Sequence, residues 1–247
     1  MTARVLVVAG LDPSGGAGLL ADLEALRAVG AEAWLVASAL TAQGPGGPRG
    51  VAPTTPAFLR AEIDALVLGA ERPGAVKAGM LGTAALARTL AERLGERPLA
   101  RLPLVLDPVL AATSGATLLE GGGLSPGVAL APLLARARLA TPNLPELHLL
   151  TGLDVSTDAG AIRAARTLPS RAVLVKGGHR RGAPVDLLVE RGRVVRLPGR
   201  RRPGTAPGTG CRLASAIAGL LAQGAGIEEA VRGARRVVAR YLDRRRG

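Results

Sequence analysis

The chain has very few aromatic residues and a single cysteine. Of its 247 residues, only Trp34, Phe58 and Tyr241 are aromatic. Proteins that bind single-stranded nucleic acid or RNA stack bases on aromatic side chains, so this composition argues against that function. The lone cysteine, Cys211, excludes an internal disulfide and a cysteine-based metal cluster.

Long apolar runs are also missing. Hydrophobic residues make up 48% of the chain, but no uninterrupted apolar run reaches the roughly 18 to 20 residues that a membrane-spanning helix needs. The first apolar run, residues 5–9, follows one basic residue and ends at Gly10 and Asp12 without a signal-peptide cleavage pattern. We therefore expect a cytoplasmic protein with no membrane partner, whose first apolar segment is a buried strand.

Lysine is nearly absent from a strongly basic chain. The formal net charge is +13, from 32 basic and 19 acidic residues, and only Lys77 and Lys176 are lysines. Such a charge can indicate phosphate contacts to nucleic acid. The arginine clusters at residues 200–202 and 244–246 are instead typical of an exposed loop and a chain end, so we expect no nucleic-acid partner.

Short apolar segments alternate with longer segments of helical period. The predicted strands span residues 5–9, 33–39, 76–78, 104–106, 139–141 and 172–176, and the predicted helices span residues 18–29, 55–68, 84–94, 128–135, 145–150, 159–167, 210–223 and 227–242. This alternation predicts an α/β fold, a three-layer αβα sandwich around a mostly parallel sheet. Two extended runs within residues 185–197 predict a late antiparallel hairpin that makes the sheet mixed at one edge. We expect one domain over residues 1–247.

Ligands bind beyond the carboxyl ends of the strands in open α/β sheets, so the residues there are candidate site residues. The segment after the first predicted strand, GLDPSGGAG, places Asp12, Ser14 and several glycines before a helix. It lacks the Gly-Lys-Ser/Thr ending of a P-loop. Two interpretations remain open, a close backbone approach to a ligand and a tight turn capped by Ser14.

Polar residues also follow three later strands. Asp107 follows the fourth predicted strand, Asn143 and Glu146 follow the fifth, and Lys176 ends the sixth. The carboxylates and Asn143 could hold a hydrated Mg²⁺ on a nucleotide, or Asn143 and Glu146 could form a helix capping box. An ammonium at Lys176 suits a point contact to a phosphate.

The segment PGTGCRLASAIAG gives the strongest local signal. Gly208, Thr209 and Gly210 lead into a helix whose first backbone N–H groups are unpaired and can bind an anion. Cys211 then lies in the first turn, where we expect a lowered pKa and a reactive or proton-accepting role. The alternative is a small, buried apolar residue.

The chain resembles the hydroxymethylpyrimidine and phosphomethylpyrimidine kinases from Ala9 to about Gly219. The resemblance rests on the order and spacing of AGLDPSGGAGLLADL, SALTAQ, AVKAGMLG, VLDPV, TPNLPE, VLVKGGH and PGTGCRLASAIAG. It implies a ribokinase-like fold that uses ATP and Mg²⁺ to phosphorylate 4-amino-5-hydroxymethyl-2-methylpyrimidine and then its monophosphate. It also implies a homodimer with small-molecule partners.

The resemblance assigns site residues by motif. Those implied near the pyrimidine are Gly10, Asp22, Gln43 and Met80. Those implied to contact ATP or its phosphates are Asn143, Lys176 and Gly177, and those implied to organise Mg²⁺ are Asp107 and Glu146. The implied catalytic residues are Gly208, Thr209, Gly210 and Cys211, with Cys211 standing where many ribokinase-like enzymes carry a general-base aspartate.

The chain departs from the usual family pattern at several positions. Gly44 follows Thr41-Ala42-Gln43 where the family usually has Asn, Thr113-Ser114-Gly115 replaces Lys-Ser-Gly, and Ala206-Pro207 replaces Thr-His. Losing a lysine and a histidine near the transferred phosphate would weaken charge stabilisation, in particular for the second phosphorylation. Two other readings stay open: a pyridoxal-type kinase of the same fold, and a catalytically impaired pyrimidine- or nucleotide-binding module.

Overall fold

A computed structural model describes residues 2–44, 47–69, 71–111, 118–179, 182–201 and 206–244. The strands of its main sheet are β1 (Arg4–Leu11), β2 (Glu32–Gly44), β3 (Gly47–Pro53), β4 (Ala75–Ala78), β6 (Leu104–Leu106), β8 (Leu139–Ala140), β9 (Ala172–Val175), β10 (Val185–Glu190) and β11 (Arg193–Pro198). The strand order is β11-β10-β9-β8-β6-β4-β1-β2-β3. A second, short sheet pairs β5 (Gly82–Thr83) with β7 (Leu119–Glu120) in parallel.

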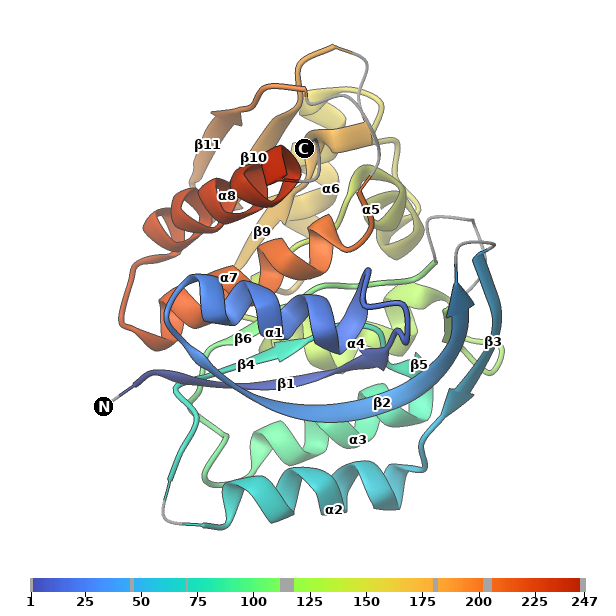
Figure 1. The fold of residues 1–247 in the computed structure, drawn as a ribbon. Helices are drawn as coiled ribbons and strands as arrows, with labels where there is room; N and C mark the ends of the chain where they lie inside the picture. Colours follow the sequence, from blue (N-terminus) through green and yellow to red (C-terminus); the bar gives the residue numbers. More distant parts are fainter. Residues whose placement is uncertain are drawn as a thin grey trace.

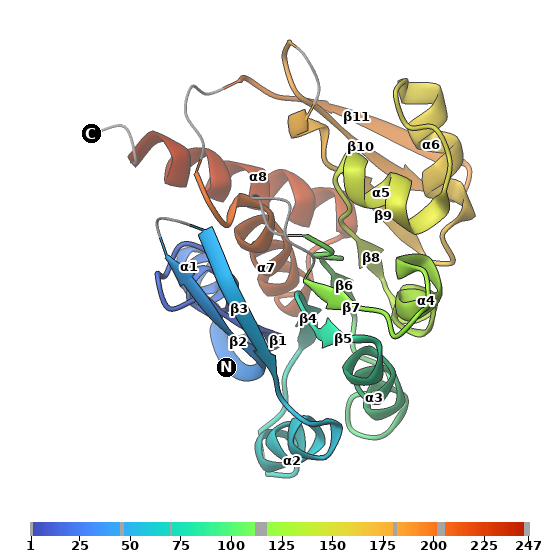
Figure 2. The same cartoon turned by 90° about the vertical axis from the view of Figure 1, so that its right-hand side faces the viewer.

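Helices cover both faces of the main sheet. One face carries α1 (Gly18–Ala28), α7 (Thr209–Ala222) and α8 (Ile227–Arg244), and the other carries α2 (Pro56–Val67), α3 (Ala84–Gly95), α4 (Pro126–Arg136), α5 (Leu144–Thr151) and α6 (Asp158–Thr167). Figure 1 shows α1 and α7 on one side of the central strands and α2 and α3 on the other. Figure 2 shows β2 and β3 at one edge of the sheet and β10 and β11 at the opposite edge. The predicted three-layer architecture is confirmed.

The side chains of β1 explain why this strand reads as one apolar run. Leu6 and Val8 pack in the core beneath α2–α6, whereas Val5 and Val7 pack in the core beneath α1, α7 and α8. All four side chains are fully buried. Successive side chains of a strand point to opposite faces, so a strand with helices on both sides must be apolar at every position.

The late hairpin is confirmed, and one prediction about the sheet is wrong. β10 pairs antiparallel with both β9 and β11. The opposite edge is also antiparallel, because β3 folds back on β2. The sheet is therefore mixed at both edges. Sequence reasoning missed β3 because its glycines and prolines are typical of a loop.

None of the helices in the described part of the chain combines the length and the apolar character that a membrane span requires.

Candidate active site

The carboxyl ends of the parallel strands meet the first turn of α7. Asp107 follows β6, Lys176 follows β9, and Gly210 is the second residue of α7. A Cβ atom on Gly210 would lie 3.1 Å from Lys176 Nζ and 3.7 Å from Asp107 Oδ2. Segments far apart in the sequence thus place a carboxylate, an ammonium and a helix N-terminus together.

Lys176 bridges two buried carboxylates. Its Nζ donates to Asp107 Oδ1 at 2.8 Å and lies 3.6 Å from Glu146 Oε2. Burial alone would raise the pKa of Asp107, but the Lys176 and Lys77 ammonium groups lower it below its usual value. Burial raises the pKa of Glu146, and Lys176 offsets only part of this effect. The Asp107 carboxylate is therefore a stable anion. The negative charge of Glu146 is only partly stabilised, because Lys176 does not fully offset the effect of burial.

Asn143 and Glu146 form a capping box at the start of α5, as one of the two sequence interpretations predicts. The Glu146 backbone N–H donates to Asn143 Oδ1 at 2.8 Å, and the Asn143 N–H donates to Glu146 Oε2 at 2.7 Å. The box orients the Glu146 carboxylate toward Lys176. The Glu146 side chain is therefore part of both the helix cap and the charge cluster around Lys176.

The donor set can be tested against a magnesium ion. Within the described ranges, no group of three or more His, Cys, Asp or Glu side chains is placed to hold a metal ion. Asp107 and Glu146 supply two carboxylates. Mg²⁺ keeps several waters and is commonly held by one or two carboxylates together with substrate phosphates, so these residues fit a magnesium ion that arrives with a nucleotide.

The N-terminus of α7 is open to an anion. Its N-cap residue, Gly208, has φ +70° and offers no side-chain acceptor to the first N–H groups. A Cβ atom on Gly208 would collide with the Gly16 carbonyl oxygen, so both the backbone conformation and the close approach require glycine. Thr209 and Gly210, the first two residues of α7, thus present N–H groups that no side chain caps.

The expected lowered pKa of Cys211 is wrong. Burial raises the pKa of its thiol to about 11, and the Lys77 ammonium offsets this only in part. The Asp22 and Asp107 carboxylates add to the increase. A helix N-terminus favours a thiolate, but desolvation and two nearby anions outweigh it here. The thiol is therefore protonated near neutral pH.

Asp22 and Lys77 form a buried ion pair beneath the site. Lys77 Nζ donates to Asp22 Oδ1 at 2.9 Å and Oδ2 at 2.8 Å, and Ser215 Oγ donates to Asp22 Oδ1 at 2.7 Å. Both charged side chains are fully buried. Burial alone would lower the pKa of Lys77, but the carboxylate outweighs it and the pKa is raised. Asp22, assigned to the pyrimidine by motif, therefore has no exposed surface for a substrate.

Sequence reasoning did not single out Lys77 as a site residue. A usable signal was present, because Lys77 interrupts the apolar strand β4 in a chain that has only one other lysine. Lysine is almost never fully buried unless it is paired. The buried lysine therefore required an acidic partner, and the structure identifies it as Asp22.

Gly10, Gln43 and Met80 lie at the ends of adjacent strands. A Cβ atom on Gly10 would lie 2.9 Å from Met80 Sδ, so glycine leaves room for the methionine. Gln43 Nε2 donates to Asp12 Oδ2 at 3.3 Å. The same Asp12 oxygen accepts the Ala17 N–H at 2.9 Å, and Asp12 Oδ1 accepts the Ser14 hydroxyl at 2.7 Å. Ser14 Oγ in turn accepts the Gly16 N–H at 3.4 Å, so Asp12 and Ser14 together hold the turn before α1.

Gly177 is engaged within the protein. Its N–H donates to Asp186 Oδ1 at 2.8 Å, and a Cβ atom there would collide with the Val185 backbone. The N–H is thus already satisfied, and Lys176 is the cationic group at this strand end that faces the α7 N-terminus.

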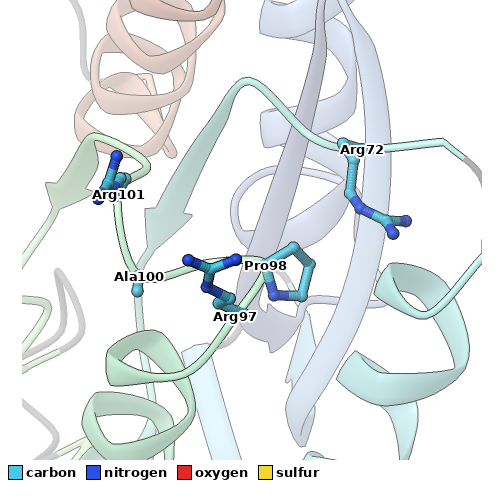
Figure 3. A pocket seen from close by; sticks show the side chains of 5 residues that line it. All are labelled: Arg72, Arg97, Pro98, Ala100 and Arg101. Atoms are coloured by element: carbon cyan, nitrogen blue, oxygen red, sulfur yellow. The ribbon is translucent and has the colours of Figure 1, made fainter.

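A large surface cavity lies away from this cluster. Figure 3 shows its lining, which consists of Arg72, Arg97, Pro98, Ala100 and Arg101. Its volume is about 590 Å³. These residues precede β4 and β6, so the cavity is at the amino ends of the strands, opposite the candidate site.

The amino-acid sequence matches a known family. The family model described as phosphomethylpyrimidine kinase matches residues 12–246. The chain belongs to the phosphomethylpyrimidine kinase family.

Curated members of the family are similar over nearly the whole chain. The chain is 40% identical over 239 residues to the thiamine biosynthesis bifunctional protein ThiED of Geobacter sulfurreducens, covering 95% of this chain but only 48% of that protein. It is 39% identical over 244 residues to the hydroxymethylpyrimidine/phosphomethylpyrimidine kinase of Streptomyces coelicolor, covering 95% and 86% of the two chains. The chain thus spans about half of the bifunctional relative and most of the kinase.

Solved structures confirm the ribokinase-like fold. A phosphomethylpyrimidine kinase from Clostridium difficile superposes with a TM-score of 0.81 at 31% identity, covering 98% of this chain and 100% of that one. An ADP complex of Bacillus subtilis pyridoxal kinase superposes with a TM-score of 0.83 at 28% identity, covering 96% and 90%. The solved structures similar to this chain therefore include a pyridoxal kinase with bound ADP.

Proposed function

We propose that the chain is a single-domain, cytoplasmic kinase that uses ATP to phosphorylate 4-amino-5-hydroxymethyl-2-methylpyrimidine and then its monophosphate in thiamine biosynthesis. The observation that carries the proposal is the cluster of Asp107, Lys176 and the α7 N-terminus in a chain of the phosphomethylpyrimidine kinase family. The departures at Thr113 and at Ala206-Pro207 make the second step the slower one. Thr113 lies outside the described residues.

The pyrimidine lies, in this proposal, against Gly10, Gln43 and Met80. The Gln43 side-chain amide offers one acceptor and two donors, which suits the amino group and ring nitrogen of an aminopyrimidine. Asp12 accepts one of those donors and so fixes which way the amide points. Asp22 does not contact substrate; it holds the Lys77 ammonium beneath Cys211.

The nucleotide phosphates lie on the other side of the cluster. Lys176 contacts them through its ammonium, whose pKa Asp107 and Glu146 raise against the effect of burial, so it stays charged. Asn143 is a neighbour of Lys176 through a parallel backbone bridge. Asp107 and Glu146 would hold the magnesium ion, which neutralises phosphate charge when bound.

Phosphoryl transfer forms a bond from the substrate hydroxymethyl oxygen to the γ-phosphorus and breaks the bond to the ADP oxygen. Residues 208–211 bind the transferred group through backbone N–H groups, where negative charge is stabilised without reorganisation. The hydroxyl proton moves to Cys211 Sγ in its thiolate form. With a pKa of about 11, this thiolate is scarce near neutral pH but strongly basic.

A kinase assay with ATP and three acceptors tests the proposal: hydroxymethylpyrimidine, its monophosphate and pyridoxal. We expect ATP-dependent mono- and diphosphorylation of the pyrimidine, with the second step slower. Phosphate transfer to neither pyrimidine would overturn it. Preference for pyridoxal would support the sister-kinase function, which the superposition on pyridoxal kinase favours as the second candidate. Ligand binding without any transfer would identify a binding module.

We further propose that the protein is a homodimer that uses the β3 edge. Two large apolar side chains on the elements flanking β3 are more than half exposed, Leu40 at 56% and Phe58 at 59%. Contiguous apolar patches are typical of subunit contacts, and we infer that these two side chains contribute to one. Sedimentation of the wild type and of Leu40→Arg tests this. We expect a dimeric mass for the wild type and a monomeric mass for the variant, and a monomeric mass for the wild type contradicts the proposal.

A further inference from the structure

Arg212 lies between the two backbone segments that border the candidate site. One is the turn of residues 12–17, called the substrate turn because its Asp12 holds Gln43. The other is residues 206–208, called the anion loop because it leads into the anion-binding residues 208–211. Arg212 follows Cys211 in the first turn of α7 and is only 3% exposed. Its Nη1 donates to the Gly16 carbonyl at 2.9 Å and to the Pro207 carbonyl at 3.3 Å. One nitrogen thus joins both segments.

The second terminal nitrogen is also held, whereas the buried Nε has no hydrogen-bond partner among the described residues. Nη2 donates to Glu24 Oε2 at 2.5 Å. The Arg212 guanidinium carbon lies 3.9 Å from the ring centroid of Tyr241 in α8, and the Tyr241 hydroxyl donates to the same Pro207 carbonyl at 3.2 Å. A planar guanidinium presents its donors in a fixed fork and stacks on aromatic rings, which a lysine ammonium cannot reproduce.

The substrate turn and the anion loop touch directly. A Cβ atom on Gly16 would lie 3.0 Å from Pro207 Cγ, and one on Gly208 would collide with the Gly16 carbonyl oxygen. The substrate turn is in turn fixed by Asp12, which accepts from the Ala17 N–H and from Gln43. Bonded contacts therefore run from Gln43 through Asp12 and Arg212 to the backbone before Cys211.

We propose that Arg212 is a positioning residue that clamps the substrate turn against the anion loop and so sets the distance between the acceptor hydroxyl and the transferred phosphoryl group. The inference rests on the proposed kinase function. Arg212, Tyr241 and Gly15 of the substrate turn line a cavity of about 630 Å³, so this turn has space to move when the clamp is lost. A displacement of about 1 Å between reacting groups can lower a rate by about 10²-fold.

The test compares kcat, KM and the unfolding temperature for Arg212→Gln, Arg212→Lys and Tyr241→Phe. We expect kcat for hydroxymethylpyrimidine to fall by about 10- to 100-fold in both Arg212 variants, with the KM for ATP nearly unchanged. Tyr241→Phe keeps the stacked ring and loses one bond to Pro207, so its kcat falls less.

Arg93→Gln is the matched control. Arg93 is as buried as Arg212, with 2% of its surface exposed. Its guanidinium donates hydrogen bonds to the Asp64 carboxylate and the Arg97 carbonyl, away from the site. This variant should lower the unfolding temperature without changing kcat. If Arg212→Gln fails to fold, Arg212→Lys and Tyr241→Phe still decide the question.

The outcomes separate the inference from the function on which it rests. An inactive wild type contradicts the proposed function. If the wild type is active and folded Arg212→Lys and Arg212→Gln keep a near-native kcat, the proposed clamp is overturned. An equal loss of kcat in Arg93→Gln also overturns it, because the loss would then follow from removing any buried arginine.

Discussion

Replacing Lys77 by methionine should strongly destabilise the protein. The substitution keeps the length of the side chain but leaves the Asp22 carboxylate fully buried without its cation. Asp22 must then bind a proton for the protein to stay folded. Its usual pKa is 3.8, and each pH unit of protonation corresponds to about 1.4 kcal/mol, so the cost near pH 7 is about 4 kcal/mol. This agrees with the roughly 3–5 kcal/mol typical of breaking a buried pair.

The cost depends on pH with a definite sign. A buried carboxyl with a folded-state pKa raised above its unfolded value destabilises the protein above the unfolded pKa, and the penalty disappears as the pH falls toward it. The penalty in Lys77→Met should therefore shrink from about 4 kcal/mol at pH 7 to about 2 kcal/mol at pH 5. For a chain of this size, about 2–4 °C of Tm are lost per kcal/mol, which gives a fall of roughly 8–16 °C at pH 7.

Thermal unfolding of the wild type and Lys77→Met at pH 5 and pH 7 measures this, together with the double variant Lys77→Met/Asp22→Leu. The double variant should recover most of the lost Tm, because replacing a whole buried pair by apolar residues is often nearly neutral. Arg193→Met, which removes an exposed pair with Glu228, should leave Tm unchanged. A Lys77→Met penalty that is small, or independent of pH, would refute the argument.

Three further predictions concern the site. Gln43→Ala should raise the KM for the pyrimidine and leave nucleotide affinity nearly unchanged in calorimetric titrations; an unchanged KM removes Gln43 from the site. Lys176→Ala and Glu146→Gln should weaken nucleotide binding more than pyrimidine binding, and equal losses of both ligands in folded protein contradict the assignment. The kcat of the wild type should rise about tenfold per pH unit between pH 6 and pH 9, because the Cys211 thiolate fraction rises below its pKa of about 11. Cys211→Ser should lose that slope and about 10²-fold or more in kcat, whereas a near-native, equally sloped profile would show that the thiol is not the base.

The sequence by itself determined the layers and the strand ends at which the candidate site lies. Apolar runs such as residues 5–9 can be buried on both faces only in a sheet covered by helices, and polar residues after such strands must meet at one edge. The small residues 208–210 ahead of an apolar helix likewise predicted an open helix N-terminus. Each of these inferences uses local chain geometry or a strand's own side-chain pattern.

Only the tertiary structure decided which charges neutralise one another. Asp22 and Lys77 are 55 residues apart in the chain, and their pairing depends on how α1 and α7 pack on the central strands β1 and β4. The same packing places the half-buried Cys211 thiol among anions and reverses the pKa shift expected from its helix position. Likewise, the Arg212 contacts join α7 to Gly16, 196 residues away. Electrostatic energies depend on the distance and burial of partners brought together by folding, and a sequence lists neither.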